Sequence, residues 1–195
     1  MKFKKALLIV DVQNDFCPGG ALGIPEGDKI IPVINKYLKI FSKKKLPIIA
    51  TRDWHPVKTK HFKDFGGVWP VHCIQNTAGA AFHSSLKLPK DAILLYKGTD
   101  PLKDSYSTFQ AQELNGTGFS HLLKLLKVNE LYICGLATDY CVRFSTLDAL
   151  KHGVKVKVLI DAIKGVDLKK GDSEKAMKEM LKKGAKKITL KVMED

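Results

Sequence analysis

The sequence predicts an α/β protein built as a three-layer, doubly wound sheet of about six mostly parallel strands. Short apolar runs alternate along the chain with longer amphipathic segments, which is typical of repeated β–α units. The apolar runs are continuous, as expected for strands that helices cover on both faces. The 195 residues suffice to bury a substantial core. We therefore expect residues 1–195 to form a single domain.

Six segments have the length and the aliphatic composition of buried strands. These expected strands are Ala6–Val10, Pro47–Thr51, Ala92–Tyr96, Glu130–Cys134, Lys155–Ile160 and Lys187–Lys191. The chain between successive strands is long enough for helical crossovers, which favour parallel pairing with right-handed connections.

Four amphipathic segments between these runs are expected to be helices. They are Asp28–Lys44, Gly118–Leu126, Thr138–His152 and Asp172–Lys183. The last segment has apolar residues on one side and lysines on the other, as a helix on the surface of a sheet requires. Gly153 and Gly184 stand where left-handed C-terminal caps are expected.

The net charge of +13 raises the question of a nucleic-acid partner. The lysines come in short runs, and the only arginines are Arg52 and Arg143. Because arginine is the preferred reader of bases, we expect no specific nucleic-acid partner and interpret the lysines as a solvated surface. The four cysteines lack CxxC spacing, which argues against a zinc knuckle or a disulfide framework.

The amino-terminal apolar run is too short to span a membrane, and no small-residue cleavage site follows it. We therefore expect a cytoplasmic protein without a signal peptide and without a membrane partner.

The segment Leu131–Arg143 carries the strongest chemical signal. Its apolar run breaks at Gly135 and resumes at Thr138–Cys141, like an N-cap that leads into a helix with a thiol in its first turn. The positive end of the helix dipole would favour a thiolate there. Cys141 is therefore a candidate nucleophile, although a lone cysteine is more often a small buried hydrophobe.

Two further charged residues follow predicted strands. Asp11 comes directly after the first strand and Lys97 after the third. Ligands of open parallel sheets bind at the carboxyl ends of the strands, so these residues should lie near Cys141. Asp11 could accept the thiol proton, and the charge of Lys97 could stabilise both neighbours. The ordinary alternatives are a turn carboxylate and a lysine at the surface.

A carboxylate and imidazoles follow the second predicted strand. Asp53 and His55 are two residues apart, so their side chains project to the same side of an extended segment. With His72 they make a plausible set for one divalent metal ion, and His61 could add a ligand. Zinc is the expected metal, and iron or manganese would accept the same donors. Any one of these histidines alone would more often be a surface or core residue.

Taken together, the motifs resemble those of nicotinamidases, which belong to the isochorismatase-like cysteine hydrolases. The segments that carry the resemblance are Asp11–Gly20, Asp53–Pro56, Trp69–Cys73, the strand end at Lys97 and Gly135–Val142. They occur in order over nearly the whole chain. The resemblance implies the isochorismatase-like fold and a catalytic triad of Asp11, Lys97 and Cys141. The metal set narrows it to nicotinamidases, because other members of the superfamily usually lack that set.

The same resemblance assigns the remaining roles. It implies metal ligation by Asp53, His55 and His72, with His61 at a position that is a ligand in some members. It also implies a cis peptide at Leu136–Ala137, with the backbone N–H groups of Ala137 and Cys141 aimed at the oxyanion.

The resemblance further places three aromatic side chains in a pyridine pocket, namely those of Phe16, Trp69 and Tyr106. Ordinary core packing is the alternative for these aromatics.

The implied reaction is hydrolysis of nicotinamide to nicotinate and ammonia through a Cys141 thioester, in NAD salvage, with pyrazinamide as an analogue. The partner would be this small molecule, and a homo-oligomer is compatible with it. Three alternatives stay open: a metal-independent hydrolase of the same superfamily, a non-catalytic basic binding domain, and a hydrolase that uses metal-bound water. Metal content and a Cys141→Ala variant distinguish them.

Overall fold

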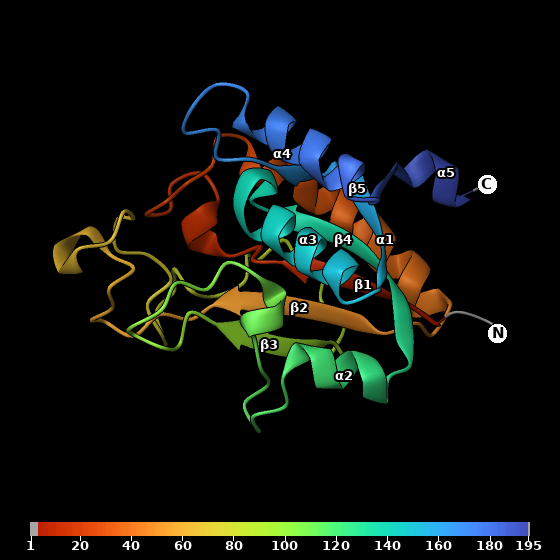
Figure 1. Cartoon of the computed structure of the whole chain (residues 1–195), viewed down its shortest axis with the longest axis horizontal. Coiled ribbons are helices and arrows are strands. Elements are labelled where there is room, and N and C mark those ends of the chain that lie inside the picture. Colours follow the sequence, from red (N-terminus) through yellow and green to blue (C-terminus); the bar gives the residue numbers. More distant parts are fainter. Residues whose placement is uncertain (1–3, 195) are drawn as a thin grey trace.

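The computed structural model describes residues 4–194, which contain a parallel six-stranded sheet between two layers of helices (Figure 1). The strands are β1 (Lys4–Val10), β2 (Ile48–Asp53), β3 (Ile93–Lys97), β4 (Val128–Leu136), β5 (Lys155–Lys164) and β6 (Lys186–Ile188). Their order is β3-β2-β1-β4-β5-β6, and every neighbouring pair is parallel. The predicted doubly wound α/β class is confirmed.

Five α-helices cover the sheet. They are α1 (Ile31–Lys43), α2 (Phe119–Leu125), α3 (Arg143–Lys151), α4 (Asp172–Lys182) and α5 (Leu190–Glu194). Helices α1 and α5 pack on one face of the sheet, and α2, α3 and α4 pack on the other. Among residues 4–194, no helix has the length and apolar character that a membrane crossing requires.

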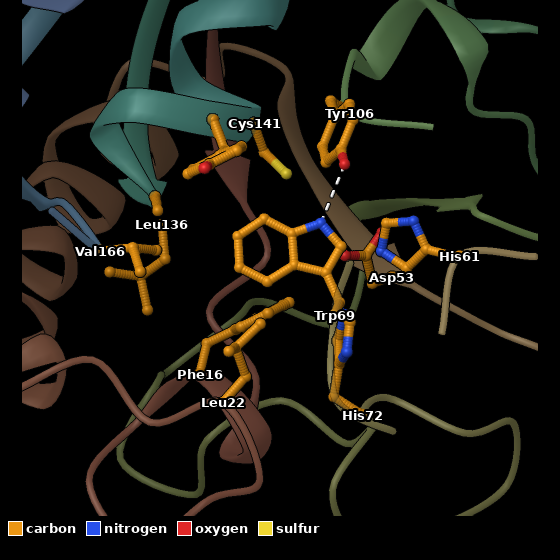
Figure 2. A pocket seen from close by; sticks show the side chains of 12 residues that line it. Phe16, Leu22, Asp53, His61, Trp69, His72, Tyr106, Leu136, Cys141 and Val166 are labelled. Carbon is orange, nitrogen blue, oxygen red and sulfur yellow. Dashed lines mark hydrogen bonds between the residues drawn. The ribbon is translucent and has the colours of Figure 1, made fainter. Parts of the chain in front are cut away.

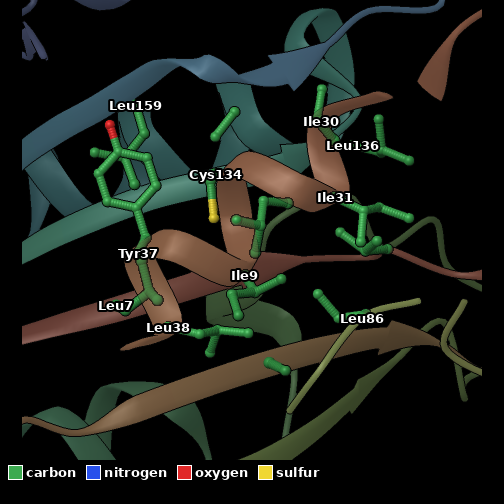
Figure 3. Close-up of a cluster of buried hydrophobic side chains, with 14 of the residues drawn as sticks. Leu7, Ile9, Ile30, Ile31, Tyr37, Leu38, Leu86, Cys134, Leu136 and Leu159 are labelled. Atoms are coloured by element: carbon green, nitrogen blue, oxygen red, sulfur yellow. The ribbon is translucent and has the colours of Figure 1, made fainter. Parts of the chain in front are cut away.

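The two cores follow from the alternation of side chains along each buried strand. In β1, Leu7 and Ile9 face the α1 layer while Leu8 and Val10 face the opposite layer, and all four are fully buried. Figure 3 shows Tyr37 of α1 in the first core, together with Leu7 of β1 and Leu159 of β5. Burying an aliphatic side chain of this size contributes about 1.5–3 kcal/mol. A continuous apolar run is therefore what a central strand needs here.

The predicted final strand, Lys187–Lys191, is wrong in its second half. Strand β6 ends at Ile188, and the chain turns into α5. The backbone N–H of Leu190 donates to Asp161 Oδ2 at 2.8 Å, which fixes the start of this helix. Leu190 and Met193 then pack against the α1 core, a contact that an extended strand would not make.

Two predicted helices also begin differently. The segment Thr138–His152 is not one helix, because a single π-helical turn at Thr138–Val142 precedes α3. The N–H groups of Tyr140 and Val142 both bond to the carbonyl of Ala137, so Thr138 lies inside the turn and is not its cap. Similarly, the helix expected from Asp28 starts as a 3₁₀ turn, and α1 begins at Ile31.

The topology places a switch point between β1 and β4. From β1 the chain winds outward through β2 and β3, and from β4 it winds the other way through β5 and β6. Crevices at such switch points are the usual ligand sites of doubly wound sheets. The long connection from β2 to β3 lies at the same carboxyl edge (Figure 1).

Candidate active site

Lys97 is the centre of the site and is buried at the end of β3. Its Nζ lies 2.9 Å from Asp11 Oδ2, within hydrogen-bond distance of Asp53 Oδ1, and 3.4 Å from Cys141 Sγ. It also donates to the carbonyl of Ser105 at 3.2 Å. Burial alone would lower the pKa of Lys97, but the neighbouring anionic groups raise it well above its usual value. Lys97 is therefore a charged ammonium that contacts the two carboxylates and the Cys141 sulfur.

Asp11 is held from both its backbone and its side chain by Thr51. The Thr51 hydroxyl donates to Asp11 Oδ1 at 2.6 Å and accepts the Asp11 backbone N–H at 3.2 Å. The other carboxylate oxygen of Asp11, Oδ2, faces Lys97. Burial raises the pKa of Asp11, and the charge of Lys97 offsets part of that rise. Asp11 is consequently a better proton acceptor than an exposed aspartate.

Cys141 lies in the π-helical turn, next to both carboxylates. Asp11, Asp53 and Cys141 each present an atom within 4.8 Å of one another. Burial raises the pKa of the Cys141 thiol well above its usual value, although Lys97 acts in the opposite direction. The prediction of a stabilised thiolate is therefore wrong for the protein without substrate. Desolvation of this buried thiol therefore outweighs the effect of the nearby positive charge of Lys97.

A second cluster holds the predicted metal ligands. The imidazoles of His55, His61 and His72 are all buried, and their ligand atoms lie within 4.8 Å of one another. Asp53 Oδ2 lies 3.8 Å from His55 Nε2, so the carboxylate connects Lys97 with this cluster. The structure thus brings the predicted ligands Asp53, His55 and His72 close to one another and to His61.

The hydrogen bonds of the three imidazoles fix which nitrogen is available. Each Nδ1 faces an oxygen: Gly98 O at 3.1 Å for His55, Asp104 Oδ1 at 2.5 Å for His61 and Pro70 O at 2.7 Å for His72. Because these oxygens only accept, each Nδ1 donates, and in a neutral imidazole the Nε2 then keeps its lone pair, as in metal-ligating histidines. His55 Nε2 is buried and has no hydrogen-bond partner. These donors fit a divalent metal ion.

The residues around the three imidazoles also suit a metal site. Gly98 has a φ of +70°, and a Cβ there would lie 2.5 Å from the His55 ring, so only glycine leaves room for that imidazole. Burial lowers the pKa of His72 to about 4, which keeps the ring neutral. Burial would raise the pKa of Asp53, but Lys97 and the histidines hold it well below its usual value. A neutral imidazole and an ionised carboxylate are the forms that bind metal.

The three predicted pocket aromatics line one cavity together with Cys141, Asp53, His61 and His72. The indole N–H of Trp69 donates to the Tyr106 hydroxyl at 2.9 Å. In the view of Figure 2, the Trp69 ring lies at the centre, with Cys141, Tyr106 and Phe16 around it. The cavity is therefore apolar and aromatic, with the thiol and the imidazoles on its wall.

The backbone before and at the π-helical turn bears out the expected cis peptide. The Leu136–Ala137 peptide is cis, and Ala137 and Cys141 both line the cavity.

Sequence reasoning missed several residues that shape the site. Thr51 closes the predicted second strand and carries a hydroxyl beside the edge, a signal that could have been used. Asp139 accepts the N–H groups of Val166 and Asp167 at 2.9 and 2.8 Å, which ties the loop after β5 to the π-helical turn that holds Cys141. Further cavity residues without any sequence signal are Leu22, Tyr140 and Val166.

Comparison with known proteins shows the family. The isochorismatase domain model matches residues 5–192. Nicotinamidase of Escherichia coli (strain K12) is 41% identical, and the alignment covers 95% of each chain. The structure of a Pyrococcus horikoshii pyrazinamidase in complex with zinc is 48% identical with a TM-score of 0.87, over 96% of this chain and 99% of that one.

A third similar protein is one from L. infantum, solved in complex with nicotinate. It is 32% identical with a TM-score of 0.85, over 97% of this chain and 94% of that one. The chain therefore belongs to the isochorismatase domain family and is a homologue of nicotinamidases over nearly its whole length.

Proposed function

We propose that this protein is a nicotinamidase, which hydrolyses nicotinamide to nicotinate and ammonia with Cys141 as nucleophile. The observation that carries the proposal is the contact of Lys97 with Asp11, Asp53 and Cys141, beside an aromatic cavity that also holds three imidazoles. The E. coli nicotinamidase and the nicotinate-bound protein from L. infantum support the choice of substrate.

In the first half of the reaction, Asp11 accepts the proton of the Cys141 thiol as sulfur attacks the carboxamide carbon. The raised pKa values of both groups suit a proton transfer that occurs with the attack. The oxyanion would accept hydrogen bonds from the backbone N–H groups of Ala137 and Cys141, each typically worth about 3–4 kcal/mol. Lys97 would stabilise the charge that develops at sulfur and at Asp11.

In the second half, the C–N bond breaks and Asp11 returns the proton to the departing ammonia, which leaves a thioester on Cys141. A water molecule that gives its proton to Asp11 then attacks the thioester. Nicotinate leaves and the thiol is restored with its proton. Asp11 thus acts as base and acid in each half, since it returns the proton of water to the Cys141 sulfur as nicotinate leaves, and Thr51 keeps the Asp11 carboxylate in place throughout.

The cavity suits an aromatic amide. The ring would lie between Phe16 and Trp69, and the hydrogen bond from Trp69 to Tyr106 sets the plane of the indole. Pyrazinamide, a similar ring with a second nitrogen, should be accepted too, as the pyrazinamidase from P. horikoshii suggests by its name.

Asp53, His55, His61 and His72 would hold one divalent metal ion, and zinc is the ion we propose. The zinc complex of the P. horikoshii protein supports it, while iron or manganese would accept the same donors. When bound, the metal would supply a Lewis-acid contact that orients the pyridine nitrogen. Because His61 Nδ1 is satisfied by Asp104, its Nε2 is free to join the ligand set predicted from sequence.

The reaction would return nicotinamide to NAD synthesis, and we place it in the cytoplasm with the whole chain acting as one domain. A metal-independent hydrolase of the same superfamily is the second candidate. It would need no donors at Asp53 and the histidines, whereas here His55 Nε2 is buried without a hydrogen-bond partner. This observation favours the metal-dependent enzyme.

The test is ammonia release from nicotinamide by metal-replete protein, with the Cys141→Ala variant beside it. We expect turnover by the wild type and none by the variant. No turnover by the wild type would remove the nicotinamidase assignment. Full turnover after the metal is removed by a chelator would favour the metal-independent alternative.

A further inference from the structure

The lysines are not spread evenly over the protein but gather where the strands begin. We call the six segments that lead into or open the strands the amino edge: residues 4–5, 43–46, 87–91, 124–130, 151–157 and 182–187. These segments hold 16 lysines against two acidic residues, a formal charge of +14. The rest of the chain has 17 basic and 18 acidic residues, a formal charge of −1. The amino edge therefore accounts for the whole net charge of +13.

The fold brings these segments onto one side of the molecule. Because all strands are parallel, their first residues lie along one edge of the sheet. Lys4 pairs in register with Val128, and Lys157 pairs with Lys186. In Figure 1 the arrowheads of β2 and β3 point to the long loops of the candidate active site, so the amino edge lies on the far side.

The charges on this edge are available to solvent. Fourteen of the 16 lysines are exposed, and Lys5 and Lys157 are half-buried. Glu130 is paired with Lys157 at 3.1 Å, so one of the two acidic residues is already neutralised by a lysine. Two surface hollows open here, one lined by Lys4 and Lys45 and the other by Lys155, Lys157 and Lys186. Such a concentration of one sign raises the local concentration of anionic partners.

We propose that the amino edge binds the phosphate backbone of double-stranded nucleic acid without sequence preference. Six strands about 4.8 Å apart span about 24 Å. A duplex presents one phosphate per about 1.7 Å of its axis, hence about 14 over that length. A protein surface contacts only the phosphates on the facing side of the duplex, so a formal charge of +14 is enough to neutralise those that the edge can reach. A spread of charge over a linear span of this length favours an extended polyanion over a single phosphate group.

The side chains also explain why no sequence would be read. Lysine presents a compact charge that contacts phosphate, whereas bidentate recognition of guanine relies mainly on arginine. Neither Arg52 nor Arg143 belongs to the amino edge. Binding of the duplex would therefore not depend on its base sequence. This agrees with the expectation from the sequence that no specific nucleic-acid partner exists. This proposal is independent of the proposed hydrolysis, since the two sites lie at opposite ends of the strands.

The test compares two variants that lose the same charge. In the edge variant, four exposed lysines become glutamine: Lys45, Lys127, Lys183 and Lys187. In the control variant, four exposed lysines elsewhere become glutamine: Lys58, Lys63, Lys169 and Lys170. Fluorescence anisotropy with two labelled duplexes of unrelated sequence measures binding between about 50 and about 200 mM salt. Thermal melting confirms that both variants fold.

We expect the wild type to bind both duplexes with similar affinity that falls steeply with salt. The edge variant should bind at least about tenfold more weakly at the lowest salt, with a slope of log K against log salt reduced by about 3 to 4. The control variant should keep the wild-type slope. No binding by the wild type at about 50 mM salt, or an equal loss in both variants, would overturn the proposal. So would binding to phosphatidylserine vesicles without binding to either duplex.

Discussion

The two edges of the sheet use the same residue type in opposite ways. At the carboxyl edge, Lys97 is 1% exposed and contacts Asp11, Asp53 and Cys141. At the amino edge, fourteen lysines are exposed and the two acidic residues are Asp91 and Glu130. Because Lys97 is buried, water screens its charge little, and this charge acts strongly on the three groups that it contacts. The exposed lysines of the amino edge instead produce a broad positive potential, which salt weakens.

Net charge therefore says little about chemistry until each charge is placed in the fold. The overall charge of +13 comes from the amino edge, whereas the proposed chemistry depends on a single cation elsewhere. If the two edges differ in this way, substitutions at the carboxyl edge should change catalysis, metal binding or stability, while matched substitutions at exposed positions should change none of them.

The largest effect is expected for Lys97→Ala. It leaves two buried carboxylates without their cation, so kcat for nicotinamide should fall at least about a hundredfold. Folding should also lose about 3–5 kcal/mol, the usual cost of breaking a buried ion pair. Steady-state kinetics and urea unfolding measure the two effects. The matched control is Lys45→Ala at the amino edge, which should change neither. If Lys97→Ala altered only KM, a charge-stabilising role for Lys97 would be contradicted.

Gly98→Ala should weaken metal binding. The added Cβ would meet the His55 ring at 2.5 Å, and the residue has a φ of +70°, so the imidazole must move. A displaced ligand typically costs about 10–100-fold in metal affinity. Titration with zinc against a competing chelator measures it. Gly116→Ala is the control, because Gly116 has a φ of +88° and a Cβ added there would meet nothing within 4 Å. Equal zinc affinity in both variants would argue against the His55 site.

Asp139→Asn should raise KM more than it lowers kcat. The amide cannot accept both N–H groups that the carboxylate accepts, so the loop with Val166 should loosen from the cavity wall. An unsatisfied buried donor costs about 1–3 kcal/mol, which corresponds to at least about a fivefold rise in KM. The control is Asp91→Asn, which changes an exposed carboxylate at the amino edge. A large loss of kcat with unchanged KM would instead place the effect at the π-helical turn that holds Cys141.

The last prediction concerns the effect of pH on the stability of the metal-free protein. Burial lowers the pKa of His72 from 6.5 to about 4, so the unfolded chain binds this proton more readily than the folded one. The resulting stability is present above about pH 6.5 and is lost as the pH falls towards about 4. The Tm of chelator-treated wild type should therefore drop more across this range than that of His72→Asn. Equal drops would show that His72 is not buried in its neutral form.

The strands and the edge that carries the site could be predicted because both depend on local patterns. Continuous apolar runs such as Ala6–Val10 have no other stable environment than a covered strand. Once the strands are parallel, residues directly after them, such as Asp11 and Lys97, must share an edge. The candidate metal ligands were predicted by the same logic and from the motif resemblance.

What could not be predicted depends on contacts between distant segments. Helix α5 forms because Asp161 caps it and α1 receives its apolar side, neither of which a short apolar run reveals. Val166 reaches the cavity through Asp139, 27 residues earlier in the chain. The pKa of Cys141 is raised by burial, whereas the sequence shows only its place near a helix start. Tertiary packing decides each of these features.

The most direct test of the proposed role of Cys141 is to trap the acyl group that the mechanism places on its sulfur. Wild-type protein is mixed with nicotinamide, quenched in acid within a turnover and digested, and the peptides are weighed by mass spectrometry. We expect a nicotinoyl group on the peptide that contains Cys141, and none in the Cys141→Ala variant. Turnover without an acyl group on Cys141, or an acyl group on another residue, would contradict the proposed mechanism.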